Sequence, residues 1–240
     1  MLKLIIYALG FNLIAGCAAN CIEANNGSLT MAKQTLNCIN AKGYTNLTEI
    51  NVRDLTNAGF LNLTQSKVTT LNSRGDNTID NSIFDTLDSR GKTKLTNIKA
   101  INLVAAGQVN LAKSTVANVD IQGDGQINDS SLTNLQCNGE CVLKQTKIAQ
   151  QMHIRGSLTM INSSAESIQI NAKQINLSNS NIKHDIVILK NNQQNQPQYL
   201  SIDGGQVDGN IIFMTNQGIV TLSHNPLIRG KIIGAKLIKN

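Results

Sequence analysis

The sequence predicts an all-β protein folded as a parallel β-helix, and a column of equally spaced glycines is the first reason. Eight glycines recur at every sixteenth position: Gly27, Gly43, Gly59, Gly75, Gly91, Gly107, Gly123 and Gly139. Self-similarity at a fixed period is typical of solenoids, in which one structural unit stacks on the next. Glycine suits a corner that recurs once per turn because it reaches positive φ without a steric cost.

Apolar columns at fixed distances from the glycines are the second reason. Positions four, nine and twelve after each glycine are apolar, as Leu63, Val68 and Leu71 are after Gly59. The position six after each glycine is always polar. A position that is apolar in every repeat faces a core, and one that is always polar faces water.

The spacing of the inward positions predicts the shape of each turn. Inward positions come in pairs, with a spacing of two within a pair, as in a strand, and of three between pairs, as at a corner. We therefore expect triangular, sixteen-residue coils, each with three short strands. The seventh position is often small and hydroxylated, as in Ser66, Ser82 and Ser114, which a narrow interior allows. Parallel strands joined by crossovers are right-handed by default, so we expect right-handed coils.

Other repeat architectures fit the period poorly. Repeats built from pairs of helices need about 33 residues or more, and leucine-rich repeats need roughly 20–29. Asparagine and threonine are also abundant here, and both form helices poorly. So short a period thus favours β-strands.

Residues 1–16 are predicted to be a secretory signal peptide. Lys3 is their only charge and precedes the apolar run Leu4–Leu13, which is too short to cross a membrane as a stable helix. Residues 17–26 are predicted to form a tether, and residues 27–240 a single β-helix domain. Within that domain we expect regular turns over 27–172, a protruding loop near 190–198 and the last turns over 199–240.

The signal peptide ends in a short motif, Leu13-Ile14-Ala15-Gly16-Cys17. This motif resembles the lipobox of bacterial lipoproteins. The resemblance implies cleavage before Cys17, attachment of acyl chains such as palmitate to that cysteine, and anchoring in a membrane. Ala18 follows in place of an aspartate, which implies the outer membrane, on its periplasmic or surface face. An ordinary signal peptide beside a chance cysteine is the alternative.

The other four cysteines suggest two local disulfides. Cys21 and Cys38 are separated by about one turn of the repeat, so they are expected on neighbouring strands within disulfide reach. Cys137 and Cys141 flank the Gly139 corner at two inward positions. An even number of cysteines in an exported protein is consistent with pairing. For Cys137 and Cys141, packing as small core residues is the alternative.

Composition limits the kinds of partner and cofactor that the protein is expected to bind. The formal charge is +6, but charges of both signs are scattered, so no basic stripe for nucleic acid is predicted. His153, His184 and His224 lack the spacing of metal ligands, and we expect neither a metal nor another cofactor.

Catalysis is not expected either, although parallel β-helices include polysaccharide lyases and hydrolases. Those families have larger coils and long loops that build a groove, and loops are nearly absent here before residue 190. The inward serines lack a histidine partner, and no carboxylate pair recurs on one face. We therefore expect no catalytic residues and no small-molecule substrate.

Over residues 27–172 the chain resembles bactofilins, a family of polymer-forming cytoskeletal proteins with small triangular β-helices. The resemblance lies in the coil size and the apolar columns. It implies a structural protein, while the lipobox implies a different location from that of bactofilins. The resulting hypothesis is an outer-membrane lipoprotein whose β-helix is a spacer or a docking surface for an envelope protein. A self-polymerising scaffold is the alternative, and a glycan-active enzyme the third.

Overall fold

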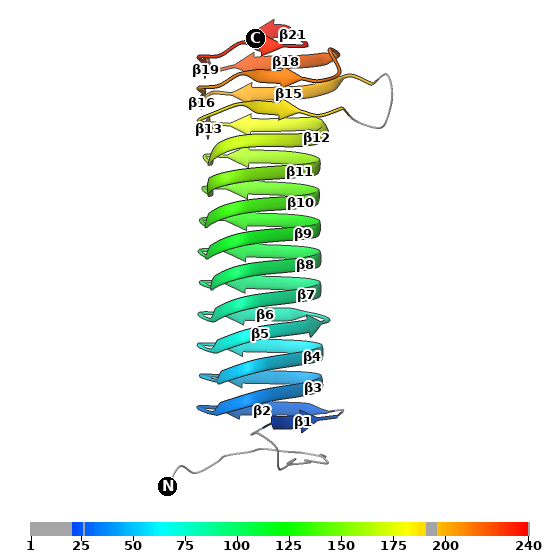
Figure 1. The fold of residues 1–240 in the computed structure, drawn as a ribbon, viewed down its shortest axis with the longest axis vertical. Coiled ribbons are helices and arrows are strands. Elements are labelled where there is room, and N and C mark those ends of the chain that lie inside the picture. The colour runs from blue at the N-terminus through cyan, green and yellow to red at the C-terminus, as the bar shows by residue number, and fades with distance from the viewer. Residues whose placement is uncertain (1–20, 26, 191–195, 240) are drawn as a thin grey trace. The chain divides into compact units, whose positions relative to one another are not determined.

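The protein is a parallel β-solenoid of about 13 turns with a spacing of about 16 residues, which confirms the predicted fold class (Figure 1). A computed structural model describes residues 21–25, 27–190 and 196–239. In this part of the chain there is no helix that could span a membrane. The chain divides into two compact units, Met1–Val116 and Ala117–Asn240.

The first unit contains the turns with the most regular spacing. Its strands are β1 (Cys21–Ala24), β2 (Ser28–Ala32), β3 (Thr35–Thr48), β4 (Asn51–Thr64), β5 (Lys67–Arg74), β6 (Asn77–Asp80), β7 (Ile83–Thr96) and β8 (Lys99–Ala112). The division between the units falls within the next strand, β9 (Thr115–Asn128).

The second unit changes from long strands to short ones. Its strands are β10 (Ser131–Lys144), β11 (Lys147–Ile161), β12 (Ser164–Ser178), β13 (Asn181–Ile182), β14 (Ile186–Ile188), β15 (Gln198–Asp203), β16 (Gln206–Val207), β17 (Ile211–Phe213), β18 (Gly218–Ser223), β19 (Leu227–Ile228), β20 (Ile232–Ile233) and β21 (Ala235–Lys239). From β13 onward each turn consists of short strands that pair in parallel with the turns on either side, as in β14 with β12 and β17.

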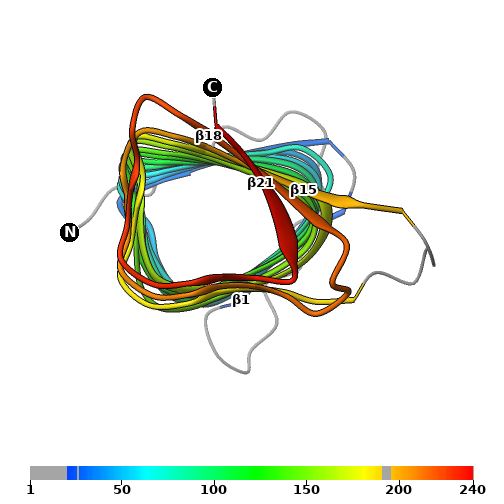
Figure 2. The ribbon, with the colours of Figure 1, turned by 90° about the horizontal axis from the view of Figure 1, so that it is seen from above.

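Coil direction can be followed in the second unit (Figure 2). With the C-terminal strands nearest the viewer, the chain runs anticlockwise from β15 through β18 to β21 as it approaches the viewer. This is a right-handed coil, as expected for parallel strands joined by crossovers.

In the regular turns, a single long strand replaces the three short strands that we expected. β3, β4, β7 and β8 are each 14 residues long and continue without interruption through the glycine corner. Gly43 remains opposite Gly59, and Gly91 opposite Gly107, so the ladder continues around the bend. The chain therefore bends at glycine without losing its inter-turn partners.

The interruption between successive long strands falls at the polar column. Its residues are exposed, as predicted, but they also adopt left-handed backbone conformations: φ is 51° at both Gln65 and Lys113, and 49° at Asn162. Bulky β-branched residues tolerate this region poorly, whereas polar residues such as asparagine accept it. The column is thus polar for two reasons, and the sequence pattern indicated only the first.

Buried serine side chains stabilise this corner by hydrogen bonds from the interior of the solenoid. The Ser66 hydroxyl donates to the carbonyl oxygen of Thr64 (2.7 Å) and accepts from the Ile50 amide of the preceding turn (3.0 Å). In the second unit, Ser163 does the same with Ile161 and Thr146. Each hydroxyl therefore satisfies backbone groups that the left-handed residue leaves without strand partners.

Successive glycines stack backbone against backbone. A Cβ atom placed on Gly91 would lie 2.4 Å from the carbonyl oxygen of Gly75, and one on Gly59 would lie 2.3 Å from that of Gly43. Both residues have strongly positive φ, 121° and 131°. Glycine is therefore required here by the closeness of the next turn as well as by the corner itself.

The interior is mostly aliphatic, with one polar chain through the first unit. Core-column residues such as Leu47, Leu63 and Ile79 are fully buried. Beside them, six buried polar side chains form a connected chain of hydrogen bonds: Thr45, Asn57, Ser73, Asn77, Ser89 and Thr93. The Asn77 amide is its centre, since it accepts from Ser73 (2.5 Å) and donates to Ser89 (2.8 Å).

Replacing Gly91 by alanine should lower the free energy of unfolding by about 2–4 kcal/mol, because alanine would be strained at this φ and would collide with the Gly75 carbonyl. Urea denaturation measures this loss. Lys94→Ala, on the same strand but exposed, is the matched control and should cost less than about 0.5 kcal/mol. Equal losses for the two variants would contradict the close glycine contact.

Asn77→Ala should destabilise the protein by about 1–3 kcal/mol, because Ser73 and Ser89 would lose their shared partner in the interior. Asn62→Ala is the control, since its amide donates to Asn46 on the outer surface (2.9 Å). Urea denaturation of both variants gives the comparison. The buried polar chain contributes nothing measurable if Asn77→Ala is as stable as the control.

Candidate functional site

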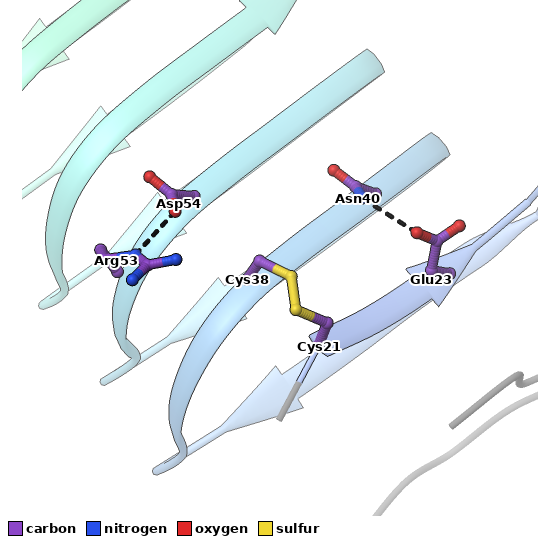
Figure 3. The surroundings of a disulfide bond; sticks show 6 residues. All are labelled: Cys21, Glu23, Cys38, Asn40, Arg53 and Asp54. Atoms are coloured by element: carbon purple, nitrogen blue, oxygen red, sulfur yellow. Dashed lines mark hydrogen bonds and ion pairs between the residues drawn. A yellow bond between two sulfur atoms is a disulfide. The ribbon is translucent and has the colours of Figure 1, made fainter. Parts of the chain in front are cut away.

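The first turn carries a covalent clamp. β1 pairs in parallel with β3, with Cys21 directly opposite Cys38, and a disulfide joins the two cysteines (Figure 3). Their Cα atoms are 4.5 Å apart. Two residues further along, the Asn40 amide donates to the Glu23 carboxylate (3.0 Å). Residues 21–24 were expected within the tether over 17–26, but they form strand β1, which is fixed to the next turn by the disulfide and by its register.

Cys17, the predicted lipid attachment point, lies in residues 1–20, outside the described part of the chain. The clamp begins at Cys21, four positions later in the sequence. Any load on a lipid at Cys17 would thus reach the solenoid through β1, whose pairing with β3 involves only Cys21–Ala24. A disulfide at that point keeps so short a strand from peeling away.

The second cysteine pair departs from the predicted bridge. Cys137 and Cys141 are free thiols, both fully buried on the two sides of the Gly139 corner. A side-chain hydrogen bond with Cys137, followed by burial, raises the pKa of Cys141 well above its usual value. This structure therefore has the two cysteines as packed core residues, as in the alternative, and not as a second disulfide.

A groove with a mixed polar and apolar lining lies on the outer face of the second unit. It has a volume of about 370 Å³ and is lined by residues of β10, β11 and β12, among them the inward Cys137 and Ile154, and by Leu189. Its polar lining side chains are Gln136, Asn138, His153, Arg155, Gln169 and Asn171. Arg155 is exposed. The groove can therefore offer a guanidinium and several amides to a ligand.

The three histidines are separate from one another, as their sequence spacing indicated. His153 lines the groove, His184 lies 3.4 Å from Glu166, and His224 bonds to Asp203. The hydrogen bond to Asp203 raises the pKa of His224. Across residues 21–25, 27–190 and 196–239, no three or more His, Cys, Asp or Glu side chains are grouped closely enough to hold a metal ion.

Reasoning from sequence alone missed the groove. Gln136, Arg155 and Gln169 occupy outward positions, where polar residues are common along the chain, so nothing in their residue types sets them apart. The one sequence signal near the groove was the loop expected over residues 190–198: Leu189, directly before that range, lines the groove, and residues 191–195 lie outside the described part of the chain.

Comparison with known proteins finds no relative from which a role could be transferred. No family model and no curated protein matches the sequence, and no solved structure matches the chain. A function is therefore inferred from the residues of this chain and their geometry.

In the oxidised protein, an unreduced proteolytic digest should contain one linked peptide pair, Cys21 with Cys38. Cys137 and Cys141 should resist alkylation in the folded protein, because both are buried, and should react after unfolding in urea. Mass spectrometry reads both results. A Cys137–Cys141 bridge, or a Cys21 thiol that reacts in the folded protein, would contradict this assignment.

Proposed function

We propose that this protein is an outer-membrane lipoprotein whose β-solenoid is a structural spacer and a docking module for another envelope protein. Lipid on Cys17 anchors the chain, and the solenoid presents its outer faces to the partner. The sequence Leu13–Cys17, placed directly after an apolar signal segment, carries this proposal.

The disulfide supports an exported location. Disulfides persist in oxidising compartments, such as the bacterial periplasm and the cell surface, and are rare in the cytosol. Cys21, four positions after the predicted anchor at Cys17 in the sequence, is bonded to Cys38. A clamp at this place suits a chain that is held at its N-terminal end.

The regular hydrogen-bond ladder supports a mechanical role. Each long strand of the first unit bonds to the turns before and after it, so the unit has few places that can bend. A rigid body attached by a short tether can hold a partner at a set distance from a membrane. A self-polymerising scaffold remains the alternative, and purified protein that assembles into unbranched filaments under the electron microscope would favour it.

Cys17→Ser should abolish lipid attachment. Bacteria that express the protein and are fed a labelled fatty acid should incorporate the label into the wild type but not into the variant. Cys141→Ser removes a cysteine but leaves the lipobox intact, so it should be labelled like the wild type.

Membrane fractionation provides the second reading of the same strains. Wild-type protein should sediment with the outer membrane, and Cys17→Ser should remain as a soluble or uncleaved precursor. Equal labelling of Cys17→Ser and wild type would overturn the lipoprotein proposal.

A further inference from the structure

The groove of the second unit is built from a regular grid of side chains. Along the first column Gln136 lies opposite His153, and His153 opposite Gln169. Along the second, Asn138 lies opposite Arg155, and Arg155 opposite Asn171. Neighbouring strands are about 4.8 Å apart, so six polar side chains from three turns point outward within a small area.

Two amides of the grid are fixed in place at opposite ends of the groove. The Asn138 amide donates to Gln122 (3.0 Å), which in turn donates to Asp120 (2.8 Å). At the other end, the Asn171 amide donates to the Lys190 carbonyl (3.3 Å). Arg155 lies between these amides and forms no ion pair with any residue that the structure describes.

One edge of the groove is an apolar ledge formed by Leu189, directly after β14. Leu189 replaces the polar residues of the second column there, and its amide donates to the carbonyl of Ile170 (2.7 Å). The buried Gln198 amide donates both to the Leu189 carbonyl and to the Ala172 carbonyl, at 2.9 Å each. Because a buried side chain holds it from behind, the ledge has a fixed position.

We propose that this groove binds an extended acidic segment of a protein partner. The proposal rests on the docking function proposed above and names the surface and the chemistry of the partner. Arg155 would receive a glutamate or aspartate carboxylate, since a guanidinium matches a carboxylate with two parallel hydrogen bonds.

The other lining residues fit the rest of such a segment. Side-chain amides both donate and accept, which matches the N–H and C=O groups of an extended backbone. Leu189 offers contact to an apolar side chain. Among the described residues no carboxylate lines the groove, so none there repels an acidic ligand, and no Trp, Tyr or Phe ring lines it for a sugar to stack on.

The direct test is fluorescence anisotropy with the full-length protein in detergent and a labelled hexapeptide of alternating glutamate and serine. A second peptide has glutamine in place of glutamate. The acidic peptide should bind, and the neutral one should bind at least about tenfold more weakly, because it lacks the charge-assisted bond to Arg155.

Substitutions in and near the groove show where the acidic peptide binds. Arg155→Gln should weaken the acidic peptide about tenfold. Gln136→Glu should weaken it as well, because a carboxylate in the neighbouring column would compete for Arg155. Lys147→Gln is the matched control: Lys147 is exposed on the same strand, β11, but does not line the groove, so binding should be unchanged.

Several results would overturn the proposal. They are equal affinity for the two peptides, an equal loss for Arg155→Gln and Lys147→Gln, or no binding of the acidic peptide. Displacement of the peptide by trigalacturonate at lower concentration than by unlabelled acidic peptide would assign the groove to acidic saccharides instead. Fatty-acid labelling at Cys17 is independent of all these outcomes, so failure here leaves the anchoring proposal to its own test.

Discussion

The close approach of one turn to the next at the glycine column is the constraint on which the regular part of this solenoid depends. Each glycine carbonyl occupies the space that a side chain on the next glycine would need. That contact lets a long strand such as β3 turn a corner and still pair along its length with the next turn. With this register fixed, apolar residues of successive turns lie next to one another and form the core.

The polar corners complete this arrangement. A left-handed residue such as Lys113 follows each long strand, and in several turns the next residue is a serine, such as Ser114, which turns a hydroxyl inward to the freed backbone groups. The interior can therefore stay narrow and aliphatic while its backbone remains satisfied. The outer faces are then free to vary, and in the second unit three successive turns use that freedom to form the grid around Arg155.

The period of the repeat is why so much of this fold could be predicted from sequence. Inward columns such as Leu47 and Leu63, and the pairing of Cys21 with Cys38, follow from counting one turn along the chain. Counting cannot reveal how a corner is closed, so the left-handed backbone at Gln65 and the role of Ser66 were not foreseen. It also cannot tell two inward thiols from a bridge, as Cys137 and Cys141 show. The groove depends on the position of Leu189, directly after β14, and the periodic columns of the sequence do not show this position.

Amide hydrogen exchange beside the glycines tests this account most directly. The Tyr44 amide donates to the Gly27 carbonyl (2.9 Å), and the Gly75 amide to the Arg90 carbonyl (2.8 Å). If the glycines permit close stacking, these amides should exchange as slowly as those in the middle of β4. If they exchange early while the middle of β4 stays protected, the glycines are flexible hinges, and the account of the stacked corner is wrong.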